Sequence, residues 1–309
     1  MNYSKLIALL LITSVVYFIY LFIPNTLTIS ESAITKQAGN TVLRGFMQFE
    51  TWEKWLTKKE KDSNSYSLAN GVVKIKSSFV SNVYCDYIIK DKNIPLTFTI
   101  ESIGKDSSKI EFQLSIDNKT LLPWQRVANY FLAQSVDAAL THTINQAIKY
   151  YTTTIANYGF DIKEEKIKDP LIVSTEKYYT DTPTVAQVYG MVDQLKQYVT
   201  SKKGVTIGDP MVYIARDKER VYLQVAYPLE KEIPIGPLFD VRKIKVKNLV
   251  SIKVIGNDQI AYKAKYEAEN YIHDQSKFAP IMPYIIYNTN RLTEKDSSKW
   301  MSTIFYPIF

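Results

Sequence analysis

The sequence predicts an α+β protein in which an N-terminal transmembrane helix precedes two antiparallel β domains. Three observations carry this prediction. Residues 6–23 are uncharged, a series of strand-like runs ends in a long helical stretch near Gly159, and the order strand, helix, strand, strand occurs twice after that glycine. We therefore expect an anchor at residues 1–24, a first domain at 25–160 and a second domain at 161–309.

The N-terminal run predicts a retained anchor. As a helix, residues 6–23 would be about 27 Å long, close to the thickness of a hydrocarbon core, and Pro24 follows as a stop. A cleaved signal peptide is the alternative, but the run has no small-x-small cleavage site. Lys5 precedes the span, whereas Glu31 and Lys36 after it cancel. The positive-inside rule therefore places the body of the protein outside the cytoplasm, with the membrane as a partner.

The elements of the first domain follow in order. Residues 25–35 alternate with the period of a strand, and residues 40–56 have apolar side chains at helical spacing. Four further strand-like runs, separated by polar turns, lie at residues 71–80, 83–90, 95–103 and 108–116. Residues 121–158 lack glycine and have proline only near the start, which predicts a long amphipathic helix laid across the sheet and ended by Gly159.

The second domain contains an internal duplication. Each half has a helix, then a strand opened by proline, then a returning strand. The matching segments are residues 185–199, 210–216 and 220–229 in the first half, and 260–272, 283–290 and 300–308 in the second. The returning strands close on "YPL" and "YPI", so the final aromatic run is the last strand of the second half.

The composition excludes several classes of protein and of site. The 38 basic residues are interleaved with 31 acidic ones, giving a net charge of +7 without an arginine-rich stripe or a nucleic-acid-reading motif. This balance predicts a solvated lysine-rich surface and no nucleic-acid partner. Cys85 is the only cysteine, and the two histidines, His142 and His273, are far apart in the sequence. We therefore expect no disulfide, no metal and no cofactor.

Both domains resemble known families. Residues 161–309 resemble the GyrI-like (AraC-type) effector-binding domain, through the duplication, the segment "PYIIYNTN" and a closing strand with Trp300 and "YPI". Residues 26–158 resemble the SRPBCC, or START-like, helix-grip fold of polyketide cyclase-like proteins, through a strand, the helical segment "FETWEKWL", a meander and a long helix. Behind an anchor, the pair resembles a membrane-anchored bacterial protein.

The GyrI-like resemblance implies a ligand cleft whose usual carboxylates are replaced. Ile285 stands at the acid of a Pro-x-Glu-x-Tyr-like segment, and Thr303 stands at the acid of a Trp-x-Thr-Glu-like segment. A buried acid would pair a cationic ligand or act as a base, so its absence favours neutral flat ligands over cations and disfavours hydrolysis. The candidate ligand-binding residues are Tyr189, Tyr213, Tyr287, Phe305 and Thr303. The aromatic ones would form a stacking pocket or simply pack the sheet, and the sequence leaves both open.

The helix-grip resemblance implies a second cavity, between the sheet and the long helix. The candidate lining residues are Tyr84, Tyr87, Phe98, Glu101 and Phe112, with ordinary core or surface positions as the alternative. Glu101 is the one acid among them, and one acid without a partner is weak evidence for chemistry. Triad, Walker and dinucleotide motifs are absent from the sequence, so no catalytic residue is assigned.

These features predict a membrane-tethered, non-catalytic binding module for hydrophobic or amphipathic small molecules. Two alternatives remain open. One is an enzyme with cyclase-like or hydrolase-like activity in either cavity, and the other is a scaffold with closed cavities that binds another protein. The absence of a paired acid and base argues against the enzyme.

Overall fold

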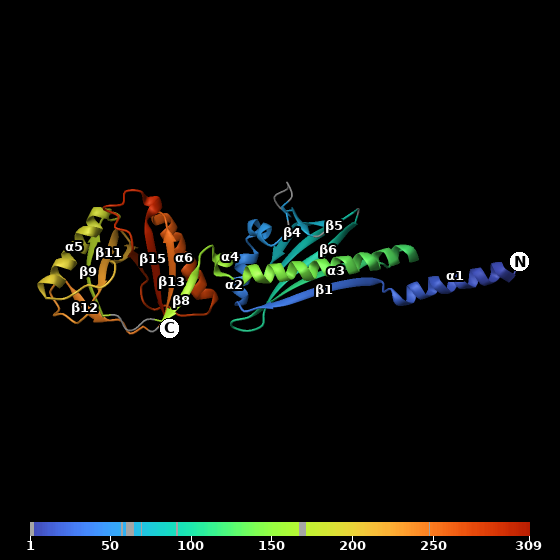
Figure 1. Cartoon of the computed structure of the whole chain (residues 1–309), viewed down its shortest axis with the longest axis horizontal. Helices are drawn as coiled ribbons and strands as arrows, with labels where there is room; N and C mark the ends of the chain where they lie inside the picture. Colours follow the sequence, from blue (N-terminus) through green and yellow to red (C-terminus); the bar gives the residue numbers. More distant parts are fainter. Residues whose placement is uncertain are drawn as a thin grey trace. The chain divides into compact units, whose positions relative to one another are not determined.

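A computed structural model describes residues 3–56, 58–59, 65–68, 70–90, 92–166, 171–246 and 248–309. The chain forms two compact units, Met1–Asn157 and Tyr158–Phe309. Each unit has one antiparallel β-sheet, covered by helices (Figure 1). The predicted α+β class with two antiparallel sheets is therefore confirmed.

The first unit is built on a seven-stranded antiparallel sheet in the order β1-β7-β6-β5-β4-β3-β2. The strands are β1 (Thr26–Thr35), β2 (Lys58–Lys59), β3 (Ser65–Leu68), β4 (Gly71–Phe79), β5 (Asn82–Ile89), β6 (Lys92–Ser102) and β7 (Ser108–Asp117). The predicted meander is present as β4 to β7, and β3 and β2 extend it beyond β4. Opposed residues such as Phe98 and Phe112 are both buried, because alternation directs one face of the sheet inward.

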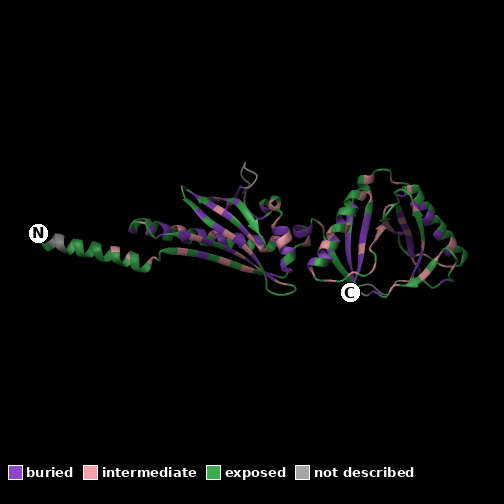
Figure 2. Ribbon diagram, turned by 180° about the vertical axis from the view of Figure 1, so that it is seen from behind, coloured by how far each residue is buried: buried purple, intermediate pink, exposed green. Residues whose placement is uncertain are grey.

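Helices cover the buried face of this sheet. They are α2 (Gly39–Phe46), the 3-10 helix η1 (Phe49–Lys54), α3 (Pro123–Tyr151) and α4 (Thr154–Tyr158). The predicted long helix is α3, which buries Val136, Leu140 and Ile144 along one side. Figure 2 shows buried positions of this helix in purple and exposed ones in green. Gly159 follows α4 with φ +75°, a left-handed conformation that glycine adopts without strain.

The structure corrects the prediction made for the N-terminal run, which is helical. It is α1 (Tyr3–Phe22), and in the described part of the chain no helix is long and apolar enough to cross a membrane. The prediction of a single-pass anchor, with the membrane as partner and an extracytoplasmic body, is therefore wrong.

The second unit has an eight-stranded antiparallel sheet in the order β12-β9-β11-β10-β14-β15-β13-β8. The strands are β8 (Ile162–Lys166), β9 (Leu171–Tyr179), β10 (Met211–Asp217), β11 (Arg220–Pro228), β12 (Asp240–Lys243), β13 (Asn248–Ile255), β14 (Tyr284–Tyr287) and β15 (Met301–Ile308). The helices are α5 (Val185–Ser201) and α6 (Asp258–Asp274). The order β9-α5-β10-β11 returns as β13-α6-β14-β15, which is the duplication that the sequence predicts.

The two halves of this unit meet at the pairing of β10 with β14. The paired residues are Met211 with Ile286 and Val212 with Ile285. Val212 packs in the core under α5, and Ile285 contacts the cores under both α5 and α6, so both helices cover the same face of the sheet. Neither described α-helix of this unit covers the opposite face at this junction, and that face contains the candidate site.

Candidate functional site

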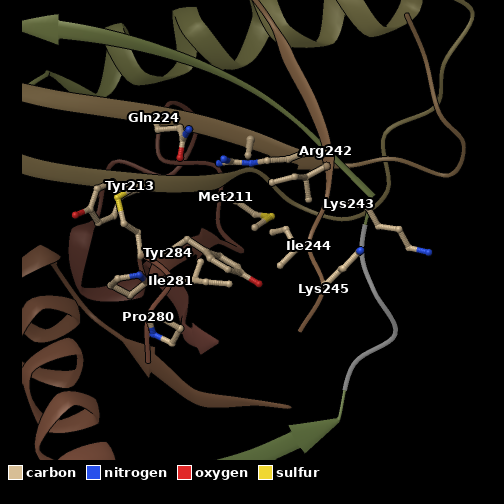
Figure 3. Close-up of a pocket in the computed structure, with 14 residues that line it drawn as sticks. Met211, Tyr213, Gln224, Arg242, Lys243, Ile244, Lys245, Pro280, Ile281 and Tyr284 are labelled. Atoms are coloured by element: carbon tan, nitrogen blue, oxygen red, sulfur yellow. The ribbon is translucent and has the colours of Figure 1, made fainter. Parts of the chain in front are cut away.

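The helix-free face has an open cavity of about 520 Å³ at the junction of the two halves (Figure 3). It is lined by Ile172, Met211, Tyr213, Gln224, Ala226, Arg242, Lys243, Ile244, Lys245, Pro280, Ile281, Met282, Pro283 and Tyr284. Its floor is a small apolar cluster in which Ile172, Met211 and Ala226 are buried. Most of the lining is therefore apolar, as in small-molecule sites.

Strand alternation explains why this face is apolar although no helix covers it. On β10, Val212 and Ile214 pack toward α5, so alternation directs Met211 and Tyr213 to the other face. The Tyr213 ring centroid also lies 5.7 Å from Lys265 Nζ on α6. On β11, Leu223 likewise belongs to the core under α5. The central strands thus have apolar side chains on both faces. One face packs against the helices, and the other lines the cavity.

The cavity walls come from segments outside the central strands. On one side, Pro280 and Pro283 restrict the backbone of the segment that enters β14. Tyr284 at the start of β14 stacks on Phe305, with ring centroids 5.6 Å apart and planes at 21°. Burial raises the pKa of the Tyr284 hydroxyl to about 12, so this group stays protonated at neutral pH.

The opposite wall is basic. Arg242 and Lys243 end β12, and Lys245 follows two residues later. Figure 3 shows Arg242 directed toward Gln224, whereas Lys243 points away from the other lining side chains. Among the described residues that line the cavity there is no carboxylate. The site therefore combines an apolar floor with a positively charged rim.

Two predicted cleft residues, Tyr189 and Tyr287, lie on the helix-covered face. The Tyr189 hydroxyl accepts a hydrogen bond from the backbone N–H of Arg291 (3.0 Å) and donates one to the Thr289 carbonyl (3.3 Å). The Tyr287 ring centroid lies 3.4 Å from the guanidinium carbon of Arg291. The space beside Tyr287 on this face measures only about 10 Å³, roughly the room that one water molecule needs. Side chains therefore fill the helix side of the junction.

The remaining predicted cleft residues are divided between positions. Tyr213 lines both the open cavity and the small space, whereas Phe305 lies behind Tyr284. The Thr303 hydroxyl donates to Asn288 Oδ1 (2.7 Å). Of the five residues, only Tyr213 lines the open cavity.

The two positions of the replaced family acids do not share a cleft. In the register of β14 with β15, Ile285 pairs with Ile304 and Ile286 pairs with Thr303. Ile285 therefore faces the helices, and Thr303 faces the opposite side of the sheet. Acids introduced at Ile285 and Thr303 would thus reach different faces.

The predicted helix-grip residues belong to a packed core or to the surface. Tyr87, Phe98 and Phe112 are almost fully buried, Tyr84 is 40% exposed, and Glu101 is exposed opposite Lys109. The Phe98 ring contacts the Phe112 ring, with centroids 4.5 Å apart. It also contacts Trp52 at 5.2 Å and Trp55 at 6.4 Å. Aromatic side chains therefore fill the core around Phe98. The unit does have an open cavity of about 570 Å³, lined among others by Ile94 of β6, Ile116 of β7 and Asn129 of α3, but none of the five predicted residues lines it.

Sequence reasoning missed most of the open cavity. Its basic wall belongs to β12 and the residues after it, for which no strand was expected. The stretch 241–246 has Val241, Ile244 and Val246 among basic residues, but Val241 and Ile244 are three positions apart, so the strand signal is weak. No comparable signal marks Gln224 or Tyr284 as cavity residues, because strand pairing decides which face they occupy.

Comparisons with known proteins give distant structural likenesses. No protein-family model matches the sequence, and no curated protein matches it. Among solved structures, the chain is similar to the EcmrR C-terminal domain (TM-score 0.41, 14% identity, 48% of this chain and 98% of that chain). It is also similar to the Zhui aromatase/cyclase from Streptomyces sp. R1128, with a TM-score of 0.31 and 6% identity over 41% of this chain and 93% of that chain. A third similar structure is SAV2435 bound to tetraphenylphosphonium, with a TM-score of 0.32 and 12% identity over 48% of this chain and 93% of that chain. Each likeness covers less than half of this chain and carries no function across to it.

Proposed function

We propose that the Tyr158–Phe309 unit binds a hydrophobic or amphipathic small molecule in the open cavity, without catalysis. The observation that carries this proposal is the cavity itself. Its volume of about 520 Å³ lies within the range of ligand pockets, roughly 300–1,000 Å³. This proposal assigns residues 161–309 to a GyrI-like effector-binding domain with its ligand on the helix-free face.

Apolar burial supplies the affinity in this proposal. Each 100 Å² of ligand surface removed from water contributes about 2.5 kcal/mol at ~25 cal/mol per Å². The tyrosines Tyr213 and Tyr284 present aromatic surface, and Met211 and Met282 adapt to the shape of a ligand. A flat, largely apolar molecule is therefore the ligand class that this lining favours.

The lining chemistry argues against an enzyme. Its polar side chains are those of Gln224, Arg242, Lys243, Lys245 and the two tyrosines. General acid–base or nucleophilic catalysis requires a titratable pair within hydrogen-bond reach, and the described lining offers no acid, histidine, serine or cysteine. In the described part of the chain no group of histidine, cysteine and acidic residues could hold a metal.

For the Met1–Asn157 unit we propose a scaffold role instead. Residues 25–160 are assigned to a START-like domain in this proposal, and aromatic rings fill its core around Trp52 and Phe98. The filled core is the observation that favours a scaffold over a second binding site.

Blocking the cavity tests the proposed binding function. Ala226 is buried on β11 in the cavity floor, so Ala226→Trp places an indole in the space of the ligand. We expect the affinity for the neutral dye N-phenyl-1-naphthylamine to fall at least about tenfold, equivalent to ~1.4 kcal/mol. The measurement is a fluorescence titration of the full chain.

The matched control is Ala215→Trp. Ala215 is half-buried on β10 and does not line the cavity, so this variant should bind the dye as the unmodified protein does. Circular dichroism melting checks that both variants fold. Undiminished binding by Ala226→Trp, or no binding by the unmodified protein, would refute the proposal.

A further inference from the structure

We infer that the ligand of the open cavity is an amphipathic anion, an apolar body that carries a carboxylate, sulfonate or similar headgroup. This inference rests on the proposed function of the same cavity and adds the charge of its ligand. Three cationic side chains, Arg242, Lys243 and Lys245, line the cavity, and no carboxylate does so among the described residues. The apolar body would lie on the cavity floor, and the headgroup would reach the basic wall.

Arg242 is the cation best placed for the headgroup. It pairs with Ile172 of β9, whose side chain forms part of the cavity floor. Figure 3 shows its guanidinium beside the Gln224 amide, so two groups with N–H donors lie together at this end of the cavity. A planar guanidinium and an amide suit the oxygens of a carboxylate or sulfonate.

Nearby acids neutralise this wall only in part. Asp240 Oδ2 lies 3.6 Å from Arg242 Nε, and both side chains are about half exposed. An exposed ion pair of this kind contributes little binding energy. It is formed by Arg242 Nε and not by Nη1 or Nη2, the two terminal nitrogens of the guanidinium. Glu176, in the adjoining depression, accepts a hydrogen bond from the Tyr222 hydroxyl (2.5 Å). Lys245 adds a second positive charge at the rim of the cavity.

The charge arrangement sets an order of ligand preference. An anion gains charge-assisted hydrogen bonds in addition to apolar burial, a neutral molecule gains only the burial, and a cation is repelled by the wall. The rings of Tyr213 and Tyr284 would attract a cation weakly, but no acid in the described lining compensates the repulsion. We expect the order anion, neutral molecule, cation.

Two dyes with one skeleton provide the test. The anionic 8-anilinonaphthalene-1-sulfonate differs from the neutral N-phenyl-1-naphthylamine by its sulfonate. In the double variant Arg242→Gln, Lys245→Gln of the full chain, we expect affinity for the anionic dye to fall about tenfold, equivalent to ~1.4 kcal/mol. Affinity for the neutral dye should change less than about twofold, since the apolar floor is intact.

The control removes the same charge elsewhere. Arg216 on β10 and Lys253 on β13 are exposed and do not line the cavity, so the double variant Arg216→Gln, Lys253→Gln has the same net charge. It should bind both dyes as the unmodified protein does, and Ala226→Trp should weaken both. Added salt should weaken binding of the anionic dye more than that of the neutral one.

The outcomes separate the two proposals. If neither dye binds, or if Ala226→Trp affects neither, the cavity is not a ligand site and both proposals fail. If the neutral dye binds in the cavity but the Arg242, Lys245 variant leaves the anionic dye unaffected, the charge inference fails and the binding function stands. Equal losses of the anionic dye in both double variants would also overturn the inference, because net charge would then explain them.

Discussion

Replacing Trp52 with alanine is expected to lower the free energy of unfolding of the Met1–Asn157 unit by about 3–5 kcal/mol. The side chain is fully buried, and its ring centroid lies 4.9 Å from that of Phe46 and 5.2 Å from that of Phe98. Its indole N–H donates to the Phe46 carbonyl (2.7 Å). The substitution therefore leaves a cavity among rings and removes the partner of a buried carbonyl, and both effects are destabilising.

A matched tryptophan provides the control. Trp124 on α3 is 66% exposed, so Trp124→Ala removes the same atoms from the surface and should change stability by no more than about 0.5 kcal/mol. The measurement is a guanidinium titration of the full chain. Hydrogen exchange of peptides from β4 to β7 assigns the loss to this unit. A loss below 1 kcal/mol for Trp52→Ala, or equal losses for the two variants, would contradict the packed core.

The same variant bears on the scaffold role of this unit. If the interior is closed because Trp52 and Trp55 fill it, removing one indole should create an apolar void that admits a small apolar molecule. Binding of such a molecule by Trp52→Ala, but not by the unmodified unit, would show that side-chain size closes the cavity. Binding by the unmodified interior would instead favour a ligand site between the sheet and α3.

Periodicity in the sequence predicted most of the elements, because it records which side of each element is buried. The alternation over 71–80 and 108–116 corresponds to β4 and β7, and the helical spacing over 121–158 corresponds to α3 and α4. The duplication in the second unit was also visible, since both halves must bury a helix on the same kind of strand pair. Hydropathy alone led to the wrong assignment of the N-terminal run as an anchor.

Most of the candidate site could not be predicted in this way. Its position depends on the pairing of β10 with β14, which lie far apart in the sequence, and on which face the helices cover. Ile285 and Thr303 illustrate the difficulty, because each belongs to a recognisable segment but the register places them on opposite faces. The basic wall was missed for a different reason, since β12 is only four residues long and gives a weak signal.

The structural role of Arg291 was also not predicted from the sequence, because an arginine in a polar loop gives no periodic pattern. Its side chain is 1% exposed and forms an ion pair with Asp258 (Nη1 to Oδ1, 2.6 Å). Nη2 donates to Ser302 Oγ (3.0 Å), and the guanidinium carbon lies 3.4 Å from the ring centroid of Tyr287 and 4.6 Å from that of Trp300. One side chain thus joins the first turn of α6 to β14 and β15.

Arg291→Ala is therefore expected to lower the free energy of unfolding of the Tyr158–Phe309 unit by about 2–4 kcal/mol. Breaking a buried ion pair typically costs ~3–5 kcal/mol, because the remaining charge is left uncompensated. Here Asp258 is 48% exposed and can recover hydration, which reduces the loss. The control is Arg220→Ala, which removes an exposed guanidinium 4.5 Å from the Tyr178 ring centroid and should cost no more than ~1 kcal/mol.

A second substitution separates packing from charge. Arg291→Met removes the ion pair but keeps a flexible, polarizable chain between Tyr287 and Trp300. Because the Arg291 Nε has no hydrogen-bond partner among the described residues, an apolar chain should fill that part of the site without loss. We expect Arg291→Met to cost less than Arg291→Ala in a denaturant titration of the full chain. Equal losses would assign the whole effect to the ion pair, and a loss for Arg291→Ala no larger than that for Arg220→Ala would refute the role of Arg291 in holding α6 to the sheet.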